Sequence, residues 1–288
     1  MYIATLIAPR GALDPTLVDT VRNAWGGGEA TWLAPDEAAE IPLATLPGNQ
    51  AQVAEEIRGM GADLVVQPAE GRCKKMLLAD MDSTMTRQEC IDELAEAAGV
   101  GAHVREITAR AMNGELDFEG ALLERVALLK GLPETAIDTV LAERISLMPG
   151  GRTLVATMKA HGAYTALVSG GFTAFTARIA AELGFDEHRA NTLLARGGHL
   201  TGDVARPVLG REAKVQALQE ITARLGIAES DVIAVGDGAN DLGMLGRVGT
   251  GVALHAKPAV AAQCDVRIDH GDLTALLYLQ GYARDAFA

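Results

Sequence analysis

The chain has 288 residues, of which 49% are hydrophobic and 4% aromatic, and its formal net charge at pH 7 is −13. This length and apolar content predict two or three domains with buried cores. The acidic balance, without a basic stripe, argues against a nucleic-acid partner, and the lack of any run of about 18 apolar residues argues against a membrane span. Because no secretory leader is visible and the cysteines form no C-x-x-C pair, we expect a reduced, cytoplasmic protein without a disulfide framework.

The first 70 residues have the pattern of a small α+β domain. In chain order, the pattern predicts a strand at 2–8, a helix at 14–25, strands near 30–34 and 40–45, a helix at 49–60 and a strand at 63–67. Asp14 is suited to cap the first helix and Pro15 to begin it. The order βαββαβ indicates a ferredoxin-like domain over residues 1–70.

This N-terminal segment contains no His, Cys or Lys, so we interpret it as a binding or packing module. Gly11 lies in its first strand–helix loop, and in this respect the segment resembles the amino-acid-binding ACT family. Two alternatives stay open for it: it binds a regulatory amino acid, or it only packs against the rest of the protein.

From residue 71 onward, short apolar strands alternate with amphipathic helices, which is typical of a doubly wound parallel sheet. We expect strands in "KMLLAD", "YTALVSGG", "DVIAVGDG" and "TGVALH", and helices near 152–161, 173–183, 211–224 and 240–246. Residues 87–147 are mostly helical by pattern, which is more than one crossover needs. The sequence therefore predicts an α/β core of residues 71–86 and 148–288, a helical cap of residues 87–147, and a hairpin within 191–204.

Three of these predicted strands end in polar residues. The first ends in Asp80 and Asp82, the second in "SGG" from Ser169, and the third in "GDGAND", which contains Asp237. Ligands of open α/β sheets bind beyond the carboxyl ends of the strands. We therefore expect these three strand ends to contribute to one site.

The residue types at these ends suit a metal ion and a phosphate. Carboxylates placed close together repel each other unless a cation intervenes, and a few hard oxygen ligands favour Mg²⁺. Ser169, the Gly170 and Gly171 amides, and Lys214 near the start of its helix add donors for a phosphate. Each motif alone also fits a structural role, such as a turn, a helix cap or a solvated lysine; their joint occurrence carries the prediction.

The motifs D-x-D-S-T from Asp80, S-G-G-F from Ser169, a lone Lys214, and G-D-G-x-N-D around Asp237 resemble those of the haloacid dehalogenase-like phosphatases. The resemblance covers residues 74–285 and extends to the members of this family that hydrolyse O-phospho-L-serine. It implies an Mg²⁺-dependent phosphatase that forms an aspartyl-phosphate and completes serine biosynthesis.

The resemblance also implies a role for each matching residue. Asp80 would be the nucleophile and Asp82 the general acid and base, and Mg²⁺ would be bound by Asp80, by the backbone carbonyl of Asp82 and by Asp237. The phosphoryl-binding residues would be Ser169, Gly170, Lys214 and Asn240, with Asp241 orienting Lys214 or a metal-bound water. In the cap, the implied substrate-binding residues are Glu89 for the ammonium, Arg125 for the carboxylate, and Met112 and Phe118 closing over the substrate.

Other interpretations remain open at this point. Glu89 and Arg125 also fit solvated helix positions, and Met112 and Phe118 fit a helical core. The substrate could be another small phosphomonoester, or the chain could be a receiver-like module that is phosphorylated on an aspartate, although a receiver has no helical insert after its acids. A homodimer is a further alternative that the sequence does not decide.

Overall fold

The computed structural model describes residues 1–112 and 116–288. Its contacts divide the chain into two compact units. The first unit contains residues 1–77, 149–165 and 227–288, and the second contains residues 78–148 and 166–226. Each unit is therefore assembled from segments that are far apart in the sequence.

The N-terminal module, residues 2–68 of the first unit, is an antiparallel sheet with two helices. Its elements are β1 (Tyr2–Ile7), α1 (Pro15–Trp25), β2 (Thr31–Ala34), β3 (Ala38–Leu43), α2 (Gln50–Gly59) and β4 (Asp63–Pro68). The strand order is β2-β3-β1-β4, so β1 is paired on both sides, with Thr5 opposite Glu40 and Val65. This arrangement confirms the predicted βαββαβ module.

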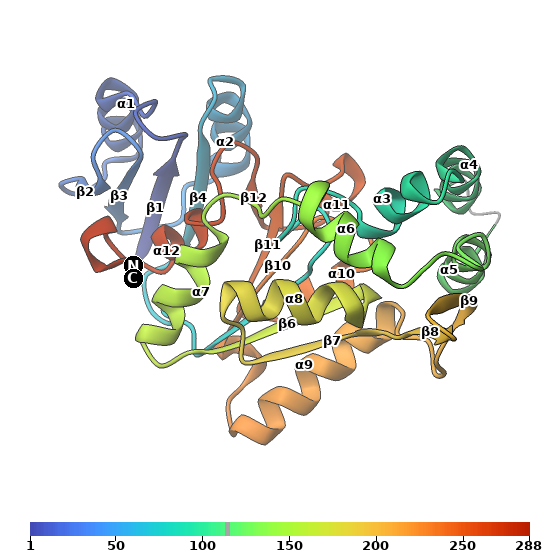
Figure 1. Ribbon diagram of the computed structural model, residues 1–288. Helices are drawn as coiled ribbons and strands as arrows, with labels where there is room; N and C mark the ends of the chain where they lie inside the picture. The colour runs from blue at the N-terminus through green and yellow to red at the C-terminus, as the bar shows by residue number, and fades with distance from the viewer. Residues whose placement is uncertain (113–115) are drawn as a thin grey trace. The chain divides into compact units, whose positions relative to one another are not determined.

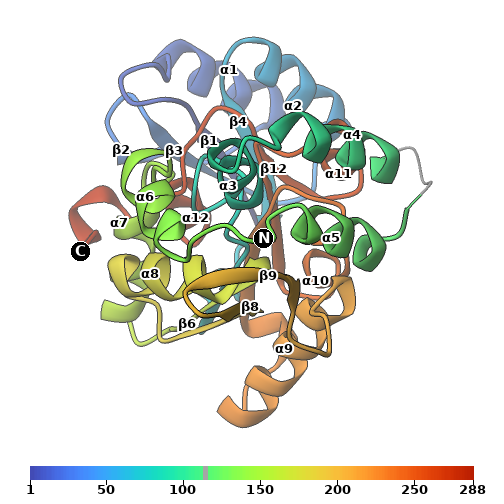
Figure 2. The same ribbon diagram turned by 45° about the vertical axis from the view of Figure 1, so that its right-hand side comes forward.

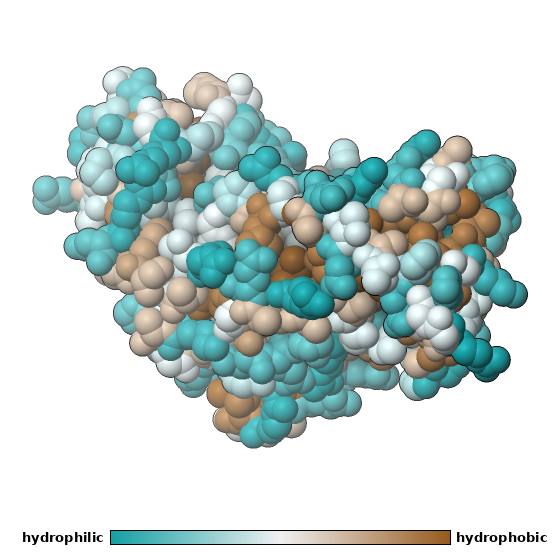
Figure 3. Space-filling model, in the orientation of Figure 1, coloured by the Kyte–Doolittle hydropathy of each residue, from teal (hydrophilic) through white to brown (hydrophobic). Residues whose placement is uncertain are grey.

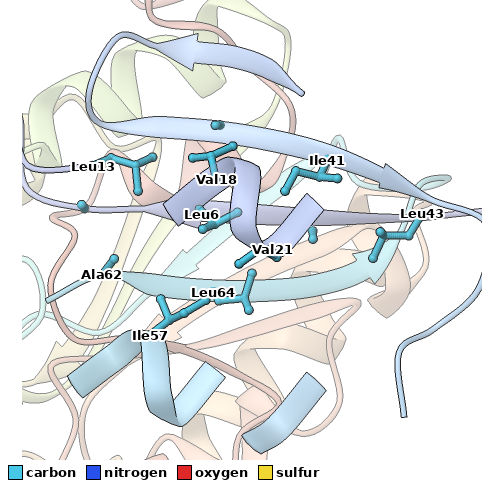
Figure 4. Packing of buried hydrophobic residues seen from close by; sticks show 12 residues of the cluster. Leu6, Leu13, Val18, Val21, Ile41, Leu43, Ile57, Ala62 and Leu64 are labelled. Atoms are coloured by element: carbon cyan, nitrogen blue, oxygen red, sulfur yellow. The ribbon is translucent and has the colours of Figure 1, made fainter. Parts of the chain in front are cut away.

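Local sequence explains the first helix of the module. The Asp14 side chain accepts a hydrogen bond from the Thr16 amide at 2.8 Å, and Pro15 occupies the first helical position. The buried face of α1 contributes Val18 and Val21 to an apolar cluster with Leu6 of β1 (Figure 4). Burial of such side chains is the main stabilising contribution to so small a module. The outward faces of α1 and α2 are mostly hydrophilic (Figure 3).

The central sheet is parallel, and its order among the described residues is β12-β11-β10-β5-β6-β7. The strands are β5 (Met76–Ala79), β6 (Tyr164–Phe172), β7 (Glu187–Asn191), β10 (Val232–Gly236), β11 (Thr250–Leu254) and β12 (Val266–Ile268). The accompanying helices are α7 (Gly151–Ala160), α8 (Thr173–Leu183), α9 (Arg211–Leu225), α10 (Leu242–Leu245), α11 (Pro258–Ala261) and α12 (Ala275–Leu279). The predicted parallel α/β sheet is confirmed, and β7 and β12 are strands that the sequence pattern did not predict.

The segment between β5 and α7 is helical, as expected. It contains α3 (Cys90–Ala97), α4 (Gly101–Met112), α5 (Phe118–Ala127) and α6 (Thr135–Glu143) (Figure 2). The predicted hairpin is formed by β8 (Leu193–Arg196) and β9 (His199–Val204). It is joined to the residues after α5 by reciprocal backbone bonds, from the Gly131 amide to the Leu200 carbonyl and from the Leu200 amide to the Leu132 carbonyl, both 2.8 Å.

Within residues 1–112 and 116–288, no helix has both the length and the apolar composition that crossing a bilayer requires.

Candidate active site

Asp80, the first residue after β5, is buried and pairs with a buried lysine. The Lys214 ammonium lies 2.7 Å from the Asp80 carboxylate, and the two side chains are 2% and 7% exposed. Lys214 is the fourth residue of α9, so the start of this helix directs its ammonium to the end of β5. A buried ion pair of this kind is costly unless both charges are well compensated, which indicates a functional role for the two groups.

The loop after β5 turns back on itself at once. The Met81 carbonyl accepts hydrogen bonds from the Met85 amide at 2.8 Å and the Thr86 amide at 2.9 Å. Ser83 adopts a positive φ of 55° in this turn, a conformation that costs energy for a residue with a Cβ. The tight turn orients the Asp82 side chain toward the start of α3.

Asp82 is held by two different elements. One carboxylate oxygen accepts a hydrogen bond from the Cys90 amide at 2.8 Å, and the other accepts one from the Ser169 hydroxyl at 3.3 Å. Desolvation, with a further contribution from the nearby Glu89 carboxylate, raises the pKa of Asp82 to about 6. A carboxyl group with this pKa can both donate and accept a proton near neutral pH.

The end of β6 brings Ser169 and two glycines beside Asp82. The Ser169 hydroxyl also accepts a hydrogen bond from the Gly171 amide at 2.8 Å. A Cβ on Gly171 would lie 2.7 Å from an Asp82 oxygen, and one on Gly170 would lie 2.9 Å from the Phe118 ring. The backbone therefore approaches both side chains more closely than a residue with a side chain would permit.

Phe118 and Glu89 from the helical segment are thus placed near the end of β6 and the loop after β5, respectively. Phe118 begins α5 and packs over Gly170, while Glu89 precedes α3 and accepts a hydrogen bond from the Ser83 hydroxyl at 2.9 Å. Met112 is the last residue of α4, and its side chain lies outside the described residues.

Arg125 of α5 lies among acidic groups. Its Nε donates to the Ala121 carbonyl at 3.2 Å. Desolvation lowers the pKa of Arg125, against the attraction of the Asp92 and Glu89 carboxylates. Burial, together with Glu89, raises the pKa of Asp92. Glu89, Asp92 and Arg125 thus form one interacting charge group in the helical segment.

Asp92 and the Cys90 amide were not among the predicted site residues. The spacing of Asp92 three residues after Glu89, on the same side of a helix, was an available signal. The contact of the Cys90 amide with Asp82 had no such signal, because it depends on the path of the turn at residues 81–89.

The first unit carries the third predicted strand end, after β10. The carboxylates of Asp237 and Asp241 are buried, and the Gly238 amide donates to Asp241 at 3.0 Å. A Cβ on Gly236 would lie 2.3 Å from the Asp241 carboxyl carbon, so a glycine is required there. Asn240 is partly buried in the same loop, and the Lys257 ammonium lies 4.0 Å from the Asp237 carboxylate.

Residues 77–246 match the family model of the haloacid dehalogenase-like hydrolases, and the chain belongs to this family. A curated relative from Streptomyces coelicolor, named phosphoserine phosphatase, is 42% identical over 235 residues, which cover 81% of this chain. The chain spans 57%, 52% and 64% of the length of this relative and two others.

Two solved structures are similar over different parts of the chain. A haloacid dehalogenase family hydrolase from Salmonella enterica serovar Typhi is 31% identical, with a TM-score of 0.87 over 99% of this chain and 98% of its own. A substrate-bound phosphoserine phosphatase is 40% identical, with a TM-score of 0.67 over 71% of this chain and 97% of its own. The first similarity includes the N-terminal module.

Proposed function

We propose that the protein hydrolyses O-phospho-L-serine to L-serine and phosphate. The observation that carries the proposal is the arrangement in the second unit. The buried Asp80–Lys214 pair follows β5 directly, and Asp82 shares a hydrogen bond with Ser169. A group of opposite charges, Glu89 and Arg125, lies in the adjoining helices. The relatives named phosphoserine phosphatase support the choice of substrate.

In the first step, a carboxylate oxygen of Asp80 attacks phosphorus, and the bond from phosphorus to the seryl oxygen breaks. Asp82 gives its proton to the departing oxygen, which leaves as the serine hydroxyl. The raised pKa of Asp82, about 6, suits a group that must be protonated at this point. The product of the step is an aspartyl-phosphate on Asp80.

In the second step, a water molecule attacks the aspartyl-phosphate. Asp82, now ionised, accepts a proton from this water, the phosphorus–Asp80 bond breaks, and Asp80 returns to its carboxylate form. Ser169, the Gly170 amide, Lys214 and Asn240 bind the phosphoryl oxygens in both steps, and the positive charge of Lys214 opposes the charge that these oxygens carry.

The acidic residues fit a divalent metal ion. Asp80, Asp237 and Asp241 each offer a buried carboxylate oxygen, and buried carboxylates are stable together when a cation balances them. Asp80, the Asp82 carbonyl and Asp237 would hold Mg²⁺, with Asp241 orienting the surrounding groups. When bound, Mg²⁺ supplies positive charge to the phosphoryl oxygens. The order of the sheet, in which β5 lies between β10 and β6, supports this assignment.

Charge complementarity defines the amino-acid part of the substrate. Glu89 binds the ammonium group and Arg125 the carboxylate, while Phe118 covers the bound molecule and excludes water. A site that relies on charged partners discriminates strongly against substrates without them. Serine biosynthesis in the cytoplasm is the setting that this activity implies.

A comparison of two substrates tests the assignment. We expect Glu89→Gln to lower kcat/KM for phosphoserine by about 30- to 100-fold and to change hydrolysis of an aryl phosphate less than threefold. The matched control is Glu93→Gln, since Glu93 lies in the first turn of α3, directly after Glu89 and its neighbours, but pairs with Arg144 at 3.3 Å. Equal losses on both substrates would favour a phosphomonoester without an amino group.

Turnover separates the phosphatase from a receiver-like module. We expect steady phosphate release that requires both Mg²⁺ and Asp80, with no release by Asp80→Asn. A protein that becomes stably phosphorylated on Asp80 without releasing phosphate would instead support the receiver.

A further inference from the structure

Asp63, at the start of β4, is a fully buried carboxylate that the proposed reaction does not use. It binds the turn that follows β12. One oxygen accepts a hydrogen bond from the Asp269 amide at 2.9 Å, and the other accepts bonds from the His270 amide at 3.0 Å and the Gly271 amide at 2.8 Å. Three consecutive amides directed at one carboxylate are a strong anion-binding arrangement.

A second set of contacts joins the N-terminal module to the same turn. Arg58 of α2 forms an ion pair with Asp269 at 2.9 Å, and its carbonyl is bonded to the His270 ring at 2.8 Å. The turn, residues 269–271, is therefore fixed by side chains more than 200 residues earlier in the chain.

The 269–271 turn also holds His255, which follows β11. The His255 ring is bonded to the Gly271 carbonyl at 2.9 Å, and the His255 amide donates to the Ile268 carbonyl at 2.8 Å. His255 also has a positive φ of 45°, a conformation that needs support from its surroundings.

Lys257, two residues after His255, contacts Asp237. The Lys257 amide donates to the Asp237 carbonyl at 3.4 Å, and the Lys257 ammonium lies 4.0 Å from the Asp237 carboxylate. All of these residues belong to the first unit.

We propose that Asp63 is a positioning residue for Asp237. It acts through the 269–271 turn and the segment from His255 to Lys257, so that the N-terminal module sets the geometry of a metal ligand. The proposal rests on the role of Asp237 in the proposed function. Since metal affinity is sensitive to the groups that orient the ligands, a shift in this segment weakens Mg²⁺ binding while phosphoserine binding through the cap is unchanged.

Titration calorimetry of the full-length protein with Mg²⁺, without substrate, tests this coupling. We expect Asp63→Asn to weaken Mg²⁺ binding by about three- to tenfold, because an amide cannot accept all three backbone bonds. His255→Asn should have a similar effect, since Asn tolerates a positive φ but is too short to reach the Gly271 carbonyl. In steady-state assays, both variants should raise the Mg²⁺ concentration for half-maximal activity and leave the KM for phosphoserine within twofold.

Glu37→Gln is the matched control. Glu37 is also a buried carboxylate of the N-terminal module, but it binds the Tyr278 hydroxyl at 2.9 Å and Arg284, which do not lead to Asp237. Wild-type Mg²⁺ affinity in both Asp63→Asn and His255→Asn would overturn the proposal while the proposed function stands. An equal loss of Mg²⁺ affinity in Glu37→Gln would also overturn the proposal. If Asp63→Asn does not fold, the Mg²⁺ affinity of His255→Asn decides. A wild-type protein that binds no Mg²⁺ would overturn both this coupling and the metal assignment.

Discussion

Asp82 has a carboxyl group whose charged form is disfavoured by desolvation and by the nearby Glu89 carboxylate. Its folded pKa of about 6 lies above the ordinary value of 3.8, so the folded state binds a proton more readily than the unfolded state between these pH values. The charge on Asp82 therefore lowers the free energy of unfolding by its full amount above pH 6. This destabilisation decreases as the pH falls toward 4.

We expect Asp82→Asn, in EDTA, to raise the free energy of unfolding by about 3 kcal/mol at pH 7.5 and by about half as much at pH 5. Urea unfolding of wild type and variant at the two pH values measures this difference. The comparison with wild type cancels the titration of acidic residues that do not interact with Asp82. An advantage that does not change between pH 7.5 and pH 5 would contradict the raised pKa.

Gly171 tests how closely the backbone must approach Asp82. In Gly171→Ala, the new methyl would lie 2.7 Å from an Asp82 oxygen and 3.0 Å from the Ser169 hydroxyl, so both side chains must move. Because a misplacement of about 1 Å can cost about 100-fold in rate, we expect kcat to fall by about 10- to 100-fold with a nearly unchanged melting temperature. Gly48→Ala, where a Cβ meets nothing within 4 Å, is the control; equal kcat values in wild type and Gly171→Ala would contradict the prediction.

At the scale of residues, the sequence predicted which side chains belong to the candidate site better than it predicted how they are oriented. Asp80 and Lys214 were predicted from the joint occurrence of the motifs, and the structure pairs them at 2.7 Å. The Ser83–Glu89 hydrogen bond depends on the positive φ of Ser83. No residue in "DSTMT" favours a positive φ as strongly as glycine would, so this contact could not be predicted.

At the scale of elements, α5 carries both Phe118 and Arg125. Asp117 caps this helix by accepting a hydrogen bond from the Gly120 amide at 2.7 Å. The loss of such a cap costs about 1 kcal/mol and loosens the first turn, where Phe118 contacts Gly170. We expect Asp117→Ala to raise the KM for phosphoserine by about three- to tenfold.

Replacing the capping aspartate of another helix separates an effect of the α5 cap on substrate binding from a general effect on stability. Asp14 caps α1 with a bond to the Thr16 amide at 2.8 Å, and we expect Asp14→Ala to lower the melting temperature similarly without changing KM. Steady-state kinetics and thermal unfolding of both variants check this pair. Equal KM changes in the two variants would exclude a specific role of the α5 cap.

The elements that the sequence missed are those without an apolar run. β7, "EHRAN", is largely polar and pairs with β6 at the edge of the sheet, and β12 has three residues. Strand patterns are read from apolar residues over four or more positions. Such strands are formed by pairing with longer neighbours, which tertiary structure decides.

At the scale of the whole molecule, the sequence predicted an N-terminal module and a core but not their contacts within the first unit. Asp63 and the Asp269 amide are 206 residues apart in the chain. Their hydrogen bond follows from the folded path and not from any local pattern. A buried Asp in a predicted strand is the one signal available, since an unpaired buried carboxylate is costly and must have partners.

Metal binding should stabilise the whole fold. Asp80, Asp237 and Asp241 are buried carboxylates, and a cation bound to the folded state alone adds about 1.4 kcal/mol at ten times its Kd. For a protein of this size, we expect Mg²⁺ to raise the melting temperature by about 2–4 °C relative to EDTA.

Asp237→Asn should lose most of this rise, whereas Asp138→Asn, which removes a surface carboxylate paired with Arg178 at 2.9 Å, should keep it. Since Asp237→Asn removes a negative charge beside the buried Asp241 carboxylate of the same loop, the variant should also melt higher than wild type in EDTA. Calorimetric scans of the three proteins with and without Mg²⁺ measure both effects, and an undiminished Mg²⁺ response in Asp237→Asn would place the ion elsewhere.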